Sequence, residues 1–113
     1  MSQITTHILD TSLGKPAQEI KVILEKEIAN NNWEKVSEGL TNKDGRLPGL
    51  VAENIILELG IYKLTFDTLS YFQKMNIEGL YPSVSISFII KDNSHYHIPL
   101  LLNPFGYSTY RGS

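Results

Sequence analysis

Hydrophobic and polar residues alternate along several short segments of the chain, a pattern typical of β-strands that bury one face. The alternation is clearest in residues 83–90, where serines separate the apolar positions. Those apolar positions are Val84, Ile86, Phe88 and Ile90. The same period occurs in residues 4–9, 20–25 and 62–66, although the charged residues of 20–25 also fit a helix. The pattern therefore predicts a mainly β protein.

One segment, residues 68–76, has helical spacing instead. Its apolar residues are Leu69, Phe72 and Met75. Asp67 or Thr68 precedes them as an N-cap, because either side chain can accept a hydrogen bond from a free backbone N–H of the first turn. We expect one short helix here that covers an edge of a sheet.

Turn signals separate the predicted strands. They lie in residues 13–16, 42–45 and 91–93. The Asp44–Gly45 pair suits a tight turn, since glycine accepts a positive φ without a steric penalty. Short strands with turns between them favour an antiparallel β-sandwich over a βαβ fold. We find no linker or internal repeat and expect one domain that spans residues 1–113.

The charge and composition exclude several classes of protein. Ten basic and twelve acidic residues give a net charge of −2, which gives no electrostatic reason to expect binding to nucleic acid and argues against a polybasic membrane patch. The absence of cysteine excludes disulfides, thiolate zinc sites and cysteine nucleophiles. No apolar segment approaches the ~20 residues of a membrane helix, and the N-terminus does not resemble a secretion signal. We therefore expect a cytoplasmic protein.

The three histidines are the first candidates for chemistry, because imidazole titrates near neutral pH. His95 and His97 are two residues apart, so on a strand they point to the same face. His7 lies at the other end of the chain, and spacing alone does not bring it near them. The simplest interpretation of each is a surface or core histidine. A zinc site of three imidazoles is a second interpretation, and a metal-free site is favoured over it.

Arg46 follows the Asp44–Gly45 turn, where a fixed guanidinium could bind an anionic or carbonyl-rich ligand. An exposed loop arginine with no ligand is the common alternative. The chain ends in Tyr110-Arg111-Gly112-Ser113. Because chain termini are often frayed, position alone gives this tail no function.

Three stretches nevertheless resemble a known family. Residues 4–17, Ile-Thr-Thr-His-Ile-Leu-Asp-Thr-Ser-Leu-Gly-Lys-Pro-Ala, are similar to the N-terminal signature of the 5-hydroxyisourate hydrolases, and residues 41–46 resemble their central motif. Residues 95–102, His-Tyr-His-Ile-Pro-Leu-Leu-Leu, and the final Tyr-Arg-Gly-Ser resemble their C-terminal signature. The motifs occur in the family's order and cover essentially the whole chain. The resemblance is to the transthyretin-like family.

The resemblance implies a β-sandwich of two four-stranded sheets with one short helix, assembled as a homotetramer with active sites in a channel where dimers meet. It implies hydrolysis of 5-hydroxyisourate, a small oxidised purine, without a cofactor or metal. His7, Arg46, His97 and Ser113 correspond to the catalytic residues. His7, Arg46 and Tyr110 correspond to the residues that bind substrate. His95 belongs to the motif but is given no catalytic role.

A carrier that binds a small ligand in the same channel, as transthyretin does, is the alternative function. A carrier does not need His7, Arg46, His97 and the Tyr-Arg-Gly-Ser tail together, and it would usually have a secretion signal. The sequence therefore favours the enzyme.

Overall fold

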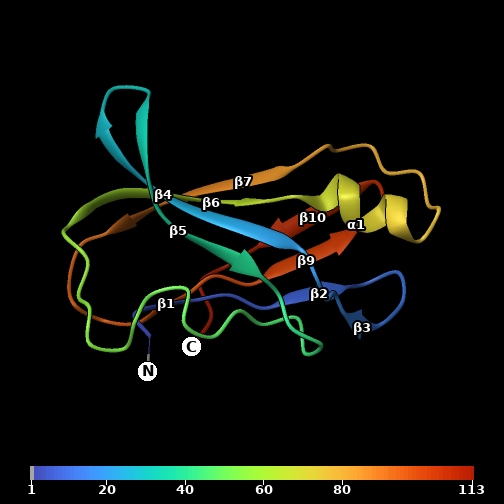
Figure 1. The fold of residues 1–113 in the computed structure, drawn as a ribbon, viewed down its shortest axis with the longest axis horizontal. Helices are drawn as coiled ribbons and strands as arrows, with labels where there is room; N and C mark the ends of the chain where they lie inside the picture. Colours follow the sequence, from blue (N-terminus) through green and yellow to red (C-terminus); the bar gives the residue numbers. More distant parts are fainter. Residues whose placement is uncertain (1) are drawn as a thin grey trace.

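The computed structural model describes residues 2–113 as a sandwich of two four-stranded sheets, with one short helix at one end (Figure 1). The elements are β1 (Ile4–Thr5), β2 (Ile8–Asp10), β3 (Lys15–Pro16), β4 (Lys21–Ala29), β5 (Asn32–Leu40), β6 (Gly60–Phe66), α1 (Thr68–Lys74), β7 (Val84–Ile90), β8 (Tyr96–His97), β9 (Leu100–Asn103) and β10 (Gly106–Thr109). The predicted fold class is confirmed.

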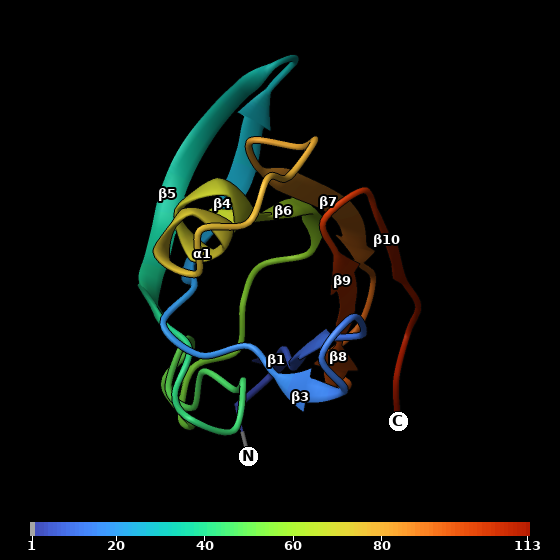
Figure 2. The ribbon, with the colours of Figure 1, turned by 90° about the vertical axis from the view of Figure 1, so that its right-hand side faces the viewer.

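The two sheets differ in how their strands pair. One has the order β5-β4-β6-β7 and is antiparallel throughout. The other has the order β10-β9-β2-β3, in which β2 and β9 pair in parallel. A third, two-stranded parallel pair joins β1 to β8. Figure 2 shows the sheets facing each other across the core, with β7 and β10 along the same side of the sandwich.

Strand β6 shows how the alternating pattern builds the core. Tyr62, Leu64 and Phe66 are each 1% exposed or less, and they face inward from one side of the strand. Burying a large apolar side chain of this kind contributes about 1.5–3 kcal/mol to folding. On β7, Val84 and Ile90 are also buried, so the predicted inward faces of both strands are confirmed.

The β4–β5 hairpin corrects one interpretation and adds an element that the pattern did not predict. Of residues 20–25, all but Ile20 belong to strand β4, not to a helix, and Val22 and Leu24 both point into the core at 0% exposure. β5 was not predicted, since no residue of this strand is buried and its sequence therefore lacks apolar alternation. The outer end of the hairpin projects beyond the sheet (Figure 1).

Helix α1 begins as predicted at Asp67, whose carboxylate accepts a hydrogen bond from the backbone N–H of Ser70 at 3.2 Å. The buried residues of α1 are Thr68, Tyr71 and Phe72. Tyr71, not predicted to face inward, donates its hydroxyl to Asp10 on β2 at 2.8 Å. The helix therefore connects the two sheets.

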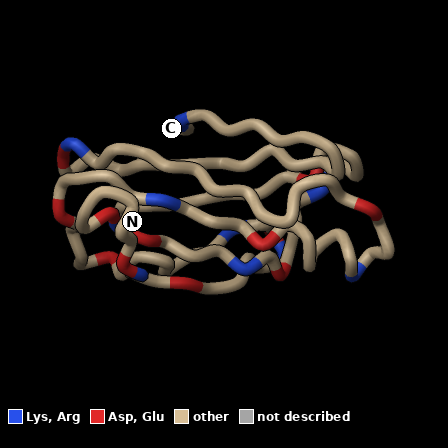
Figure 3. Tube along the Cα trace, turned by 90° about the horizontal axis from the view of Figure 1, so that it is seen from above, with Lys and Arg blue, Asp and Glu red and all other residues tan. Residues whose placement is uncertain are grey.

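No helix within residues 2–113 is long and apolar enough to cross a membrane. Acidic and basic residues are interspersed along the chain trace, as Figure 3 shows. The fold matters for function chiefly because its parallel strand pairs bring the two ends of the chain together.

Candidate active site

The N-terminal strands present Thr5 and His7 to the outer face of the sandwich. Ile4, Thr6 and Ile8 are buried, each at 2% exposure or less. Side chains alternate along a strand, so the two residues between them point away from the core. Thr5 and His7 are both half-buried.

Strand pairing places His97 on this same face. The parallel register sets Thr5 opposite His97, and the N–H of Ile98 donates to the carbonyl of Thr5 at 2.9 Å. Two residues farther along, the N–H of Leu100 donates to the carbonyl of His7 at 2.9 Å. His7 and His97, 90 positions apart in the chain, are therefore near neighbours across two adjoining strands.

Arg46 reaches the site through a turn that we call the arginine turn, residues 42–46. The side-chain oxygen of Asn42 accepts hydrogen bonds from the backbone N–H groups of Asp44 at 2.9 Å and Arg46 at 3.1 Å. The backbones of His7 and Arg46 then form an antiparallel bridge. Residues paired in such a bridge share a face, so Arg46 joins His7 and His97.

The predicted role of glycine in this turn is confirmed. Gly45 has a φ of 72°, a conformation that favours glycine. A Cβ atom at this position would also lie 2.5 Å from the carbonyl oxygen of Ile8. Glycine lets the turn approach β2 closely enough for the N–H of Ile8 to donate to the Gly45 carbonyl at 2.8 Å.

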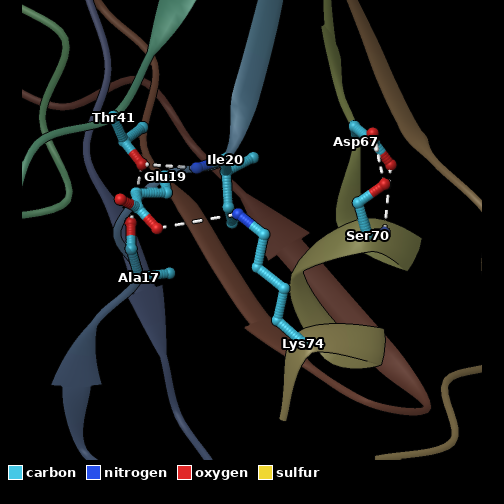
Figure 4. A network of polar contacts seen from close by, with 7 residues as sticks. All are labelled: Ala17, Glu19, Ile20, Thr41, Asp67, Ser70 and Lys74. Carbon is cyan, nitrogen blue, oxygen red and sulfur yellow. Dashed lines mark hydrogen bonds and ion pairs between the residues drawn. The ribbon is translucent and has the colours of Figure 1, made fainter. Parts of the chain in front are cut away.

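A buried threonine anchors the start of the arginine turn (Figure 4). The Thr41 hydroxyl accepts from the N–H of Ile20 and donates to the carbonyl of Ala17, both at 2.9 Å. Beside it, the ammonium group of Lys74 lies 3.6 Å from the carboxylate of Glu19. The turn is therefore attached to the segment that joins β3 to β4 on one side and to the backbone of His7 on the other.

His97 has a second contact that the motif did not predict. The Thr5 hydroxyl lies 2.7 Å from Nδ1 of His97 and also 2.7 Å from Nε2 of His95. The two rings are roughly parallel, with their centroids 6.2 Å apart. One hydroxyl thus joins both histidines of the C-terminal motif.

Both site histidines are poised to stay neutral near physiological pH. Burial lowers the pKa of His97 below its ordinary value of 6.5, and the charge of Arg46 lowers it further, as do His95 and His7 when either is protonated. Burial and the Arg46 charge also lower the pKa of His7, while a hydrogen bond with the Asp44 backbone opposes them. A neutral imidazole is the form that can accept a proton.

The C-terminal tail is held against the site strand. The N–H of Gly112 donates to the carbonyl of His97 at 2.8 Å. The Arg111 guanidinium lies 4.3 Å from the centre of the Tyr96 ring and donates to the carbonyl of His95 at 3.1 Å. The expectation from general rules that a terminus frays does not hold here.

The other two predicted site residues are placed differently. Tyr110 is 58% exposed and lines an apolar pocket of about 320 Å³ beside Phe88 and Ile98. That pocket is not lined by His7, Arg46 or His97. Ser113 is exposed, one residue beyond the tail's contact with β8. Within one chain the structure brings together His7, Arg46 and His97, and it does not bring Tyr110 to them.

The zinc interpretation finds no support in the geometry. No three His, Cys, Asp or Glu side chains among residues 2–113 are grouped so that they could hold a metal ion.

The sequence did not reveal two residues that contact His97. Thr5 contacts its side chain, and Gly112 contacts its backbone. Threonine beside a strand histidine carries no signal of its own. Only the parallel register between the chain's two ends reveals the contact.

Comparison with known proteins decides the family. The model of the HIUase/Transthyretin family matches residues 4–112. The chain belongs to this family. A mouse 5-hydroxyisourate hydrolase is 44% identical over 114 residues, which cover 99% of this chain and 96% of the relative. The resemblance drawn from the motifs is thereby confirmed.

Two solved structures represent both branches of the family. Klebsiella pneumoniae 5-hydroxyisourate hydrolase superimposes with a TM-score of 0.87 and 38% identity, covering 99% of this chain and 100% of that chain. Sea bream transthyretin in complex with thyroxine superimposes with a TM-score of 0.90 and 26% identity, covering 97% and 94%. The fold is thus common to a 5-hydroxyisourate hydrolase and a transthyretin that binds thyroxine, and the site residues must distinguish the two functions.

Proposed function

We propose that this protein hydrolyses 5-hydroxyisourate to 2-oxo-4-hydroxy-4-carboxy-5-ureidoimidazoline in the breakdown of urate. The observation that carries the proposal is the placement of His7, Arg46 and His97 on one face by strands from both ends of the chain. The identity to relatives named 5-hydroxyisourate hydrolase, 41% over 111 residues for that of Salmonella dublin, supports the same substrate.

The two histidines activate water. Water is a weak nucleophile at neutral pH, so a base must accept its proton as it attacks the cyclic amide carbonyl. Both His7 and His97 have a pKa below the ordinary value, which keeps them neutral and able to accept that proton. One takes the proton and the other orients the water. General base assistance of this kind contributes about 10²–10⁴-fold in rate.

Arg46 stabilises the charge that forms during the attack. Addition of water to a carbonyl places negative charge on its oxygen, and a preorganised cation acts best where charge develops. The arginine turn fixes the backbone of Arg46 beside His7, while its side chain is exposed to an incoming ligand. The leaving amide nitrogen receives a proton from the histidine that became charged.

The tail completes the substrate site. Tyr110 hydrogen-bonds the substrate, and Ser113 orders the water or a histidine tautomer. This chemistry needs no organic cofactor, metal or covalent intermediate.

We infer that the protein forms a homotetramer, because His7, Arg46 and His97 lie on an open face of the single chain and need neighbouring subunits to enclose them. Around Arg46 a single chain forms a pocket of only about 160 Å³. β7 and β10 are both edge strands, and such strands readily pair with another chain. Ile89 on β7 is 64% exposed and Tyr107 on β10 is 44% exposed. Neighbouring subunits would enclose the His7–Arg46–His97 face and bring a tail from another chain toward it.

The test follows the ultraviolet loss of 5-hydroxyisourate freshly made from urate. We compare the wild type with His97→Asn and Arg46→Gln, and we use Lys43→Gln as the control, because Lys43 is an exposed cation of the same turn. We expect wild-type decay far above the spontaneous rate, a loss of about 10²-fold or more in the two site variants, and a wild-type rate in the control.

Decay no faster than in buffer would exclude the hydrolase. Activity that survives exhaustive chelation in metal-free protein separates the proposed site from a zinc hydrolase. Light scattering gives the assembly, and a monomer at micromolar concentration would contradict the enclosed site.

The alternative is a carrier, favoured by the close superposition on a transthyretin that binds thyroxine. A carrier would bind an aromatic ligand in its channel without turnover, and His97→Asn would then alter affinity alone. Measured turnover that depends on His97 decides for the enzyme.

A further inference from the structure

One hydroxyl group contacts a ring nitrogen on each of two histidines, and this has a consequence for their protons. Thr5 Oγ1 is 2.7 Å from Nδ1 of His97 and 2.7 Å from Nε2 of His95. Both distances are those of good hydrogen bonds. A threonine hydroxyl has one hydrogen to donate and two lone pairs to accept with. It can therefore donate to only one of the two nitrogens.

The protonation of the two rings is coupled through this single hydrogen. If the hydroxyl donates to Nδ1 of His97, that ring carries its proton on Nε2, and His95 must donate to Thr5. If the hydroxyl donates to His95, then Nδ1–H of His97 donates to Thr5 and Nε2 of His97 is bare. Only the second arrangement gives neutral His97 a free lone pair on the nitrogen that Thr5 does not contact.

We propose that Thr5 is a positioning residue that holds His97 in the Nδ1–H tautomer, with its hydroxyl proton directed to Nε2 of His95. His97 then presents a bare Nε2 as the base for water. When Nε2 takes the proton, the imidazolium keeps its Nδ1–H bond to Thr5, so no hydrogen bond is lost during the step. His95 acts as the acceptor that keeps the threonine hydrogen away from His97.

Contacts on both sides hold the two rings in place beside the hydroxyl, whichever nitrogen it donates to. Thr5 is held by β1, and its carbonyl accepts from the N–H of Ile98, which follows His97. On the other histidine, Arg111 donates to the His95 carbonyl at 3.1 Å. Both rings are therefore fixed by their own backbones on either side of the hydroxyl. That the hydroxyl couples the two rings follows from the contacts alone, whereas the choice of the Nδ1–H tautomer of His97 rests on the proposed hydrolase function, which needs a bare Nε2.

The experiment is a long-range ¹H–¹⁵N correlation of the imidazole nitrogens, recorded on the full chain at a pH well above 6.5, where unperturbed histidines are neutral. His97 signals are assigned by their loss in His97→Gln. The test variants are Thr5→Val, which removes the hydroxyl at nearly constant shape, Thr5→Ser, which keeps it, and His95→Phe, which removes its acceptor. Thr6→Val is the control, because the Thr6 hydroxyl donates to the Ile98 carbonyl.

We expect the Nδ1–H tautomer of His97 in the wild type, in Thr5→Ser and in Thr6→Val. In His95→Phe the ring nitrogen of His97 is the side-chain acceptor left within reach of the hydroxyl proton, so His97 should change to the Nε2–H tautomer. In Thr5→Val the single tautomer should give way to a mixture. The rate of hydrolysis should change with the tautomer. We expect kcat to fall about tenfold in Thr5→Val and His95→Phe, as expected for one lost hydrogen bond, with KM nearly constant. Thr5→Ser should keep the wild-type kcat.

An Nε2–H tautomer in the wild type would overturn the inference, as would an unchanged tautomer in His95→Phe. The latter variant decides the question alone if Thr5→Val does not fold. A wild type without hydrolase activity whose tautomers respond as expected would overturn the proposed function and leave the role of Thr5 standing.

Discussion

The antiparallel sheet and the strands that carry the histidines are built in different ways. In the sheet of β5, β4, β6 and β7 paired residues lie at most 44 positions apart, as Val22 and Phe66 do, and the inner face is filled by residues such as Leu64. The β1–β8 pair instead joins residues 92 positions apart, as Thr5 and His97 show. The first region secures stability, and the second assembles a half-buried polar face. We therefore expect substitutions in the two regions to affect different properties.

The largest expected effect on stability lies in the antiparallel sheet. Leu64 is 0% exposed, and Leu64→Ala should lower the free energy of unfolding by about 2–5 kcal/mol, because it removes buried methyl groups and leaves a cavity. The rate of hydrolysis per folded molecule should stay at the wild-type value. Urea unfolding and the ultraviolet assay measure the two quantities. Thr65→Ala, on the opposite face of β6, is the control and should cost about 1 kcal/mol or less.

A substitution beside the histidines should lower activity and leave stability nearly unchanged. A Cβ atom on Gly112 would collide with Cδ2 of His97, so Gly112→Ala must displace either the ring or the tail. We expect a loss of about 10²-fold in kcat/KM from a small misplacement of the base, with little change in the urea midpoint. Gly106→Ala is the matched control, since its Cβ would meet only the Asn103 side chain at 3.7 Å. Equal activity in both variants would contradict the placement of the tail.

The N-cap of α1 tests whether a change in the helix, which contacts both sheets, affects stability alone. Asp67→Ala removes the bond to the Ser70 N–H at 3.2 Å and should cost about 1 kcal/mol of unfolding free energy. Asp67→Asn retains a capping oxygen and should recover most of that loss. Activity should be unaffected in both. A drop in kcat would show that α1 transmits strain to β2 through the Tyr71–Asp10 hydrogen bond.

The smallest effect concerns pH. Because burial and the Arg46 charge lower the pKa of His7 and His97 below 6.5, each becomes protonated only at a lower pH than a free histidine. The acid limb of kcat/KM, which reports the free enzyme, should therefore fit pKa values below 6.5. In Arg46→Gln the residual limb should move upward. A limb above 6.5 in the wild type would contradict the electrostatics of the site.

The same contrast explains what the sequence could and could not predict. Alternation identified β6 and β7, and Asp67 marked the start of α1, because these signals are local. The pattern missed β5, whose residues such as Val36 are exposed and show no period. Family motifs named His7, Arg46 and His97, but no local signal shows that Thr5 lies between His95 and His97. That contact depends on a register between the two ends of the chain.

The central claim is that residues from both ends of the chain act as one catalytic unit. A double-mutant cycle of His7→Asn and His97→Asn, measured as kcat/KM on protein shown to be folded, tests it most directly. Residues that act as a unit give strongly non-additive losses. We predict that the double variant is about as slow as the slower single variant. Losses that multiply would show that the two histidines act independently and would contradict the account.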